Sequence, residues 1–138
     1  MTTGEGWSTV GGITFRVESP EFLHTRVHGD VDGAIMRGLF ELVRDVSSRI
    51  GRPCYWLHDL STFRDFTPDA RRVAADLDPS SIAATAVYGG TFRQRIAANM
   101  LVRAGALLGR PVPPARFCAG EAEARVFLDA QRRRDGRG

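Results

Sequence analysis

The chain has 138 residues, the length of one domain, and 43% of them are hydrophobic and 25% charged, as in ordinary globular proteins. No apolar run approaches the ~20 residues that span a bilayer, and the N-terminus lacks the basic and apolar parts of a signal peptide, so we expect a cytoplasmic protein without a membrane segment. The net charge of +3 comes from arginines spread along the chain, which gives only weak support for a nucleic-acid partner.

A β-hairpin is the first predicted element, because residues 1–11 are rich in Gly and Thr and are expected to be disordered. Apolar and polar residues alternate through residues 12–19 and 22–30, which is the pattern of half-buried strands. Only a short turn at Pro20 separates these two segments, so we expect them to pair antiparallel.

A helix is predicted from about residue 32 to residue 50. Asp30 and Asp32 are candidate N-caps, apolar residues recur at helical spacing, and Gly51 ends the helix. The following segment, CYWLHDL at residues 54–60, is almost continuously apolar, which indicates a central strand buried on both faces.

A short helix is predicted to begin near Thr67, inside the segment DLSTFRDFTPDARR at residues 59–72. Thr67 suits the N-cap position and Pro68 suits the first helical position. The part of this segment before Thr67 is expected to be a loop. IAATAVYGG, at residues 82–90, is then predicted to be a second buried strand.

A long helix is predicted from Gly90 or Thr91 to about residue 108. Its main apolar stripe recurs every three or four residues and consists of Phe92, Ile96, Met100, Ala104 and Leu107. Ala98 and Val102 lie off this stripe, so the helix has more apolar surface than one face needs. Either neighbouring elements cover it unusually well or it is a self-association surface, so a homodimer is a hypothesis.

A strand at residues 115–120 and a helix at 121–134 complete the predicted order, β-β-α-β-α-β-α-β-α. Strands separated by helices pair in parallel through right-handed crossovers. We therefore predict a single α/β domain at residues 12–133, with a mixed, mostly parallel sheet of about five strands. The basic tail at residues 134–138 is expected to be a solvated, frayed terminus.

The two cysteines are the remaining candidates for special chemistry. Cys54 and Cys118 lie in predicted strands, and no metal-ligand spacing joins them to the three histidines. We therefore expect two buried, reduced thiols, no metal and no cofactor.

Three segments, in this order and spacing, resemble the STAS domain family, which includes the bacterial anti-sigma-factor antagonists. They are VHGDVD at residues 27–32, YWLHDLSTFRDFTPDARR at 55–72 and ARFCAGEAEARVFL at 115–128. The resemblance covers about residues 12–133 and implies a STAS-like fold. The lipid-binding CRAL-TRIO domains are often compared with this fold.

The resemblance also raises phosphorylation. In the regulatory antagonists, a Ser in an Asp-Ser-Ser-Gly-like loop before the short helix is phosphorylated by a partner kinase. Thr67 falls at or near that position here, but Pro68 follows it and no Ser-Ser-Gly is present. The chain is therefore more similar to the uncharacterised STAS-like branch that keeps the fold and has lost the acceptor motif. Thr67 and Ser61 stay open, as a cap and a turn residue or as phosphoacceptors.

Open α/β sheets bind partners and ligands at the carboxyl ends of their strands. Two such ends can be named here, and both lead into helix starts, which favour anions. The candidate binding residues at these ends are Asp59, Ser61, Phe66, Thr67, Arg71, Tyr88, Gly89, Gly90, Thr91 and Arg93.

No catalytic constellation emerges from the sequence. His58 and Asp59 are neighbours on a predicted strand, so they point to opposite faces and do not form a dyad. We expect a non-enzymatic regulatory module that binds a partner protein through residues 59–72 and the adjacent helix starts. The alternative is a carrier or sensor of a lipid-like or anionic ligand, with an apolar pocket lined by Tyr55, Phe66 or Tyr88.

Overall fold

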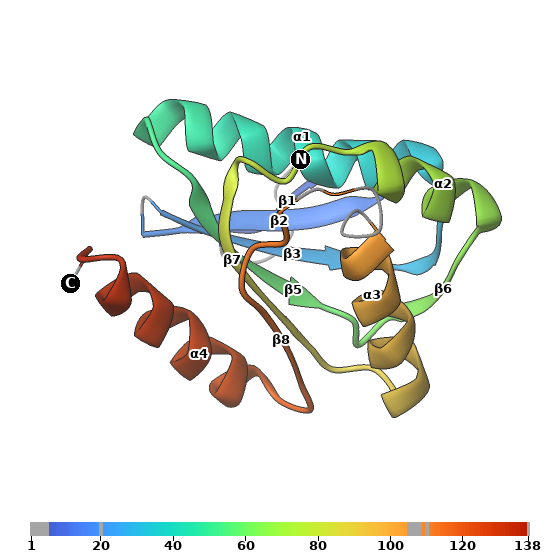
Figure 1. Cartoon of the computed structure of the whole chain (residues 1–138). Coiled ribbons are helices and arrows are strands. Elements are labelled where there is room, and N and C mark those ends of the chain that lie inside the picture. The colour runs from blue at the N-terminus through green and yellow to red at the C-terminus, as the bar shows by residue number, and fades with distance from the viewer. Residues whose placement is uncertain (1–5, 20, 105–108, 110, 138) are drawn as a thin grey trace.

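The computed structural model describes residues 6–19, 21–104, 109 and 111–137 and arranges them in three layers (Figure 1). A six-stranded sheet forms the middle layer, with α1, α2 and α3 on one face and α4 on the other. The elements in chain order are β1 (Ser8–Val10), β2 (Ile13–Glu18), β3 (Phe22–Val27), β4 (Gly29–Val31), α1 (Gly33–Ile50), β5 (Cys54–Asp59), β6 (Phe63–Phe66), α2 (Pro68–Asp76), β7 (Ile82–Tyr88), α3 (Phe92–Ala104), β8 (Ala115–Cys118) and α4 (Glu121–Arg134).

The strand order of the main sheet is β1-β2-β3-β5-β7-β8. β1, β2 and β3 pair antiparallel, whereas β3, β5, β7 and β8 pair parallel. The predicted mixed, mostly parallel sheet is therefore confirmed, with six strands in place of about five. All residues of β5 are buried, as predicted, because helices cover both faces of this central strand.

β1 lies within residues 1–11, where the sequence analysis expected disorder. Gly11 and Gly12 have φ values of 51° and 82°, and they form the two-residue turn that returns β1 onto β2. The ring of Trp7, just before β1, makes cation–π contacts with the guanidinium groups of Arg16 and Arg26, which lie 4.6 and 4.8 Å from its centre. The prediction of disorder is thus wrong for the second half of this segment, and residues 1–5 lie outside the described residues.

β4 and β6 form a separate, two-stranded parallel sheet that was not predicted. β6 lies inside the segment that was expected to be a loop before Thr67. The rings of Phe63 and Phe66 are buried with centroids 4.5 Å apart, and Arg64 donates two hydrogen bonds to Asp30 of β4. A four-residue strand that buries both ends shows too little alternation to be recognised from the sequence.

The predicted helix caps are confirmed. The Asp32 carboxylate and the Thr67 hydroxyl each accept a hydrogen bond from the backbone N–H three residues later, at 2.9 and 3.1 Å. Gly51 ends α1 with a φ of 74°. Asp69, in the first turn of α2, accepts a hydrogen bond from the Gly33 N–H at 3.0 Å and so joins the starts of α1 and α2.

The main apolar stripe of α3 faces solvent and not the core. Phe92, Ile96 and Met100 are 71%, 44% and 68% exposed, whereas Ala98 is the buried residue of this helix. The small side chain of Ala98 lets the helix approach its neighbours closely, so packing at one point fixes which face turns inward. Residues 105–108, where the helix was expected to continue, lie outside the described residues.

The C-terminal tail is packed against the domain as far as Arg137, so the expectation of a frayed terminus is wrong. Glu21, immediately before β3, is 3% exposed and forms ion pairs with Arg52, Arg132 and Arg137. Arg137 also donates a hydrogen bond to the Pro53 carbonyl at 2.7 Å. One buried carboxylate therefore holds the end of α4, the tail and the loop before β5 together.

Candidate functional site

The carboxyl ends of β5 and β7 meet at Asp59. One oxygen of its buried carboxylate accepts a hydrogen bond from Arg26 Nε and the other from the Ser61 backbone N–H, both at 2.7 Å. Burial alone would raise the pKa of Asp59, but the hydrogen bonds from Ser61 and Arg26 outweigh it and hold this pKa below its usual value. The Asp59 carboxylate is therefore ionised and held in place by hydrogen bonds at the carboxyl end of β5.

Gly89 and Gly90 form the turn from β7 to α3, with φ values of 78° and 68°. A Cβ at Gly89 would lie 3.2 Å from Oδ1 of Asp59, so the two strand ends approach too closely for a larger residue without movement. Arg95 donates hydrogen bonds to the carbonyl oxygens of Gly89 and Gly90, at 3.2 and 2.9 Å. This turn therefore packs tightly and is tied back to α3.

A capping box that the sequence analysis missed fixes the start of α3. The Thr91 N–H donates to Oε1 of Gln94 at 2.8 Å, and the Gln94 N–H donates to the Thr91 hydroxyl at 3.1 Å. Nε2 of Gln94 also donates to the carbonyls of Phe63 and Arg64 in β6, at 2.8 and 3.1 Å. The spacing T-x-x-Q was the available signal. Gln94 thus joins α3 to residues 59–72, and two N–H groups of this helix start are already used.

The two candidate phosphoacceptors differ in their surroundings. Ser61 is exposed, whereas Thr67 is half-buried and its hydroxyl caps α2. The structure therefore assigns Thr67 the capping role, and phosphorylation of either residue stays a prediction.

The candidate residues do not all lie on one surface. Asp59 and Tyr88 lie on the α4 side of the sheet, whereas the ring of Phe66 belongs to the core on the α1 side. Arg71 of α2 and Arg93 of α3 are exposed on the same side as Phe66. The structure thus brings residues 59–72, α2 and the start of α3 together, whereas Tyr88 is buried on the α4 side of the sheet.

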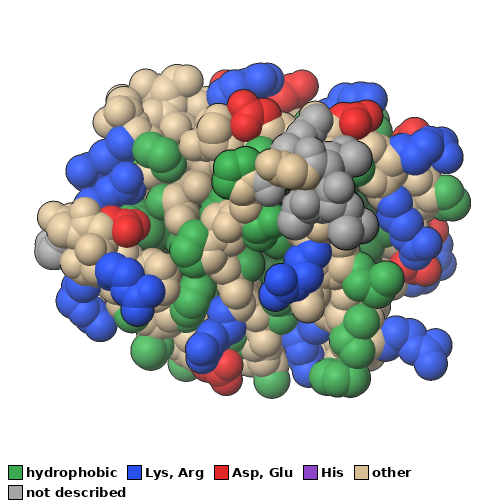
Figure 2. Space-filling model, viewed as in Figure 1, with side chains coloured by type: hydrophobic (Ala, Val, Ile, Leu, Met, Phe, Trp, Pro, Cys, Tyr) green, Lys and Arg blue, Asp and Glu red, His purple; other side chains and the backbone are tan. Residues whose placement is uncertain are grey.

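An open groove of about 260 Å³ lies between α2 and α3, lined by Ala97, Met100, Leu101 and Ala104, with Arg71 at its α2 side. Figure 2 shows hydrophobic side chains gathered over α3 with arginines beside them. α3 contains three arginines and no acidic residue. We define the α3 surface by six residues: Arg71, Phe92, Arg93, Ile96, Met100 and Arg103.

A second polar cluster, also missed from the sequence, lies on the α4 side. The Tyr88 hydroxyl lies 2.8 Å from Nε2 of His24, whose Nδ1 lies 2.9 Å from Glu18, and Arg125 donates two hydrogen bonds to Glu18. Burial opposes ionisation of Glu18, but the hydrogen bonds from Arg125 and His24 hold its pKa at about 2. A Tyr-His-Glu chain is the geometry of a proton relay. Here His24 and Tyr88 are buried, and the Trp7 ring packs against His24 with the two rings tilted by 58°, so the cluster attaches α4 to the sheet through Arg125.

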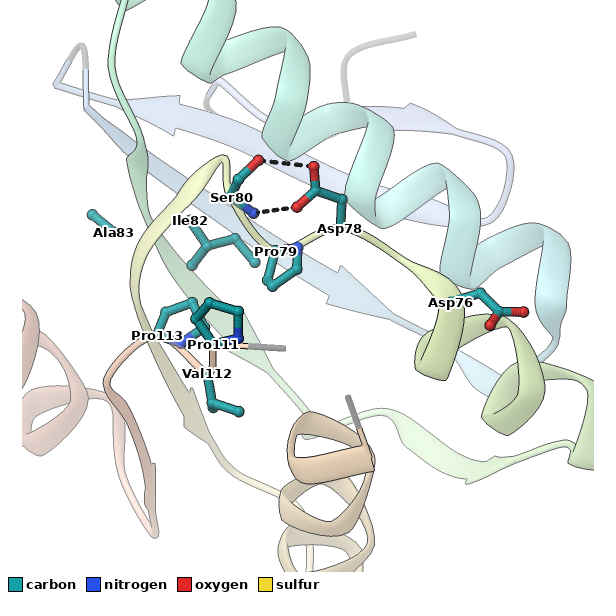
Figure 3. A pocket seen from close by; sticks show the side chains of 9 residues that line it. All are labelled: Asp76, Asp78, Pro79, Ser80, Ile82, Ala83, Pro111, Val112 and Pro113. Atoms are coloured by element: carbon teal, nitrogen blue, oxygen red, sulfur yellow. Dashed lines mark hydrogen bonds between the residues drawn. The ribbon is translucent and has the colours of Figure 1, made fainter. Parts of the chain in front are cut away.

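A wider cavity of about 520 Å³ lies at the opposite end of the parallel strands (Figure 3). Within it, the Ser80 N–H and hydroxyl both donate to Asp78, at 3.0 and 2.9 Å. Prolines and aliphatic side chains make up most of its remaining lining: Pro79, Ile82, Ala83, Pro111, Val112 and Pro113. This cavity is large, but the described residues that line it contain no cluster of reactive side chains.

Within the described part of the chain, no group of three or more His, Cys, Asp or Glu side chains is placed to hold a metal ion. None of the helices described there has the length and apolar character needed to cross a membrane. Cys54 and Cys118 are free and buried, and burial raises the pKa of both thiols to about 11.

The chain is similar in structure to an uncharacterized protein of the DUF3478 family from Shewanella loihica PV-4, whose crystal structure at 2.25 Å resolution has a SpoIIAA-like fold. The TM-score is 0.61 and the sequence identity 17%, and the match covers 88% of this chain and 97% of that chain. No protein-family model matches the sequence, and no curated protein does. The chain therefore has a SpoIIAA-like fold, which confirms the predicted STAS-like architecture.

Proposed function

We propose that this chain, built on a SpoIIAA-like fold, is a non-enzymatic interaction module that binds an acidic partner protein through the α3 surface. The observation that carries the proposal is the solvent-facing stripe of Phe92, Ile96 and Met100. Large apolar side chains four residues apart on one helix face are the anchors against which an amphipathic segment of a partner packs.

The charge around this stripe supports an acidic partner. The charged side chains that α3 contributes to the surface are all arginines, and Arg71 of α2 borders the groove beside Met100. A second copy of this chain would bring arginines opposite arginines, whereas acidic side chains would pair with them. A complementary partner protein is therefore favoured over a homodimer as the occupant.

Segment 59–72 contributes by supporting this surface. Gln94 anchors α3 to the carbonyls of Phe63 and Arg64, and Thr67 caps the helix that carries Arg71. The sequence analysis placed the partner-binding region on residues 59–72 and the adjacent helix starts, and the proposal extends it along the outer face of α3.

Three purified proteins test the proposal: the wild type, the double variant Phe92→Ser/Met100→Ser and the control Val126→Ser. Val126 lies on α4 and is 66% exposed, so its replacement removes a comparable exposed apolar side chain far from α3. Each protein is used to capture partners from an extract of the source organism. A captured protein is then purified, and its Kd for each of the three is measured by calorimetry.

We expect the wild type and Val126→Ser to bind the same acidic protein equally, and the double variant to bind at least ~10-fold more weakly. Added salt and the variant Arg93→Glu should also weaken the complex. Equal Kd values for all three proteins would contradict the proposal. The proposal would also be contradicted if the double variant changed only self-association of the chain, or only its binding to anionic lipid vesicles.

A further inference from the structure

A small apolar cavity of about 90 Å³ lies between the sheet and the three helices on one of its faces. Phe40 of α1 and Leu101 of α3 line its helical side, and Trp56, His58 and Thr85 line its sheet side. Ala98, Leu101 and Val102 of α3 line it, whereas Phe92, Ile96 and Met100 of the α3 surface are exposed to solvent, so the cavity is separate from the α3 surface.

His58 enters this cavity as a neutral ring with its proton on Nε2. The Trp56 indole N–H donates to Thr25 Oγ1 at 2.7 Å, and Thr25 Oγ1 lies 2.5 Å from Nδ1 of His58. The hydroxyl of Thr25 has no other acceptor among the described residues, so it donates to Nδ1, which leaves the ring proton on Nε2. Burial lowers the pKa of His58 to about 4, so the ring is uncharged at neutral pH.

Nε2 of His58 is therefore a donor without an acceptor in the described part of the chain. His58 is 8% exposed and lines the cavity. Every described side-chain nitrogen or oxygen that is fully inaccessible has a hydrogen-bond partner. Since Nε2 has no partner, it must retain some accessible surface, which faces the cavity. The hydroxyl of Thr85, which is 7% exposed, lines the same cavity and also lacks a partner among the described residues. Two hydrogen-bonding groups thus face an otherwise apolar space.

We propose that this cavity binds a small, uncharged molecule with an apolar body and one acceptor oxygen, such as a ketone, ester or amide, whose oxygen accepts from Nε2 of His58. A carboxylate fits poorly, because a neutral ring and apolar walls would leave a buried anion unpaired.

The size of the cavity limits the occupant. A cavity of ~150 Å³ accepts benzene, so about 90 Å³ takes only a few heavy atoms as the structure stands. A larger occupant would displace α3, in which Ala98 is buried and Ala97 and Leu101 are partly buried against the core, while Gln94 and Arg95 bond its start to β6 and to the turn before it.

NMR titration of the full chain with three probes of nearly equal shape tests the inference. Acetone carries the acceptor oxygen, 2-methylpropene replaces that oxygen with a methylene group, and acetate adds a charge. We expect acetone to shift the Nε2 and Hε2 resonances of His58 and the methyl resonances of Thr85 and Leu101, and acetate to leave them unchanged.

The variants His58→Leu and Thr85→Val separate hydrogen bonding from simple filling of space. His58→Leu should weaken acetone binding by about fivefold or more and leave 2-methylpropene binding unweakened. Equal effects on both probes, or His58 resonances that stay unmoved in the wild type, would overturn the proposal and leave a cavity that holds only water. If His58→Leu does not fold, the wild-type His58 shifts and Thr85→Val decide the matter.

Discussion

We predict that Glu21→Gln lowers the free energy of unfolding by about 2–3 kcal/mol. Breaking a buried ion pair by removing one partner costs ~3–5 kcal/mol, because the other charge stays behind unpaired. The side chains of Arg52, Arg132 and Arg137 are 48%, 32% and 13% exposed, so water can reach two of the three guanidinium groups and recover part of that cost. The expected value therefore lies below the range for a fully buried pair.

Urea unfolding followed by circular dichroism measures this change in free energy. In thermal unfolding, the Tm should fall by roughly 6–12 °C. Asp129→Asn is the matched control, since it removes a carboxylate from an exposed position of α4 and should stay within ~0.5 kcal/mol of the wild type. Removing residues 135–138 would delete the contacts of Arg137 with Glu21 and the Pro53 carbonyl and also the hydrogen bond from the Tyr55 hydroxyl to Asp135, so it should destabilise the protein as well. Indistinguishable results for Glu21→Gln and Asp129→Asn would refute the role of this carboxylate.

Three further predictions concern single side chains. Gly33→Ala should destabilise by ~1 kcal/mol in urea unfolding, because its Cβ would collide with the Asp69 carboxylate that accepts from Gly33. In an Asp69→Ala background the same change should cost less, since only the Val73 methyl, 3.0 Å from the new Cβ, would still have to move, and an equal cost there would contradict this account. Thr67→Ala should cost ~1 kcal/mol through loss of the α2 cap, with Thr67→Ser recovering most of it; no loss would remove the capping role. The pKa of His58 is about 4 in the folded state and about 6.5 when the ring is exposed, so the unfolded state binds more protons between these two pH values. The free energy of unfolding should therefore fall as the pH drops from 6.5 to 4 and stay level above pH 6.5. The same pH series on His58→Leu should show a shallower slope, and an unchanged slope would assign the effect to other groups.

The elements that the sequence predicted well have local causes. The cap residues of α1 and α2 act within one helical turn, and the apolar run of β5 reports burial on both faces regardless of its neighbours. β1 had a local signal, because the Gly11–Gly12 pair is typical of a two-residue hairpin turn. β4 and β6 had none, because each depends on a partner more than thirty residues away.

The orientation of α3 shows why a hydrophobic stripe alone does not identify the buried face. The larger residues, Phe92 and Met100, predicted an inward side, yet the fixed start of the helix at Gln94 and the close packing at Ala98 turned them outward. The candidate sites follow the same rule. His58 could be assigned its unused N–H only after the register of β3 against β5 placed Thr25 beside it.

The two tryptophans of the chain lie on opposite faces of the sheet, which makes its fluorescence a position-specific signal. Trp7 packs against His24 on the α4 side with ring centroids 4.9 Å apart, whereas Trp56 lies edge-on to the His58 ring with centroids 5.6 Å apart. Replacing Trp7 with phenylalanine would leave the emission of Trp56 alone, next to the cavity beneath α3. The difference between the two emission spectra would then report separately on the attachment of the N-terminal hairpin.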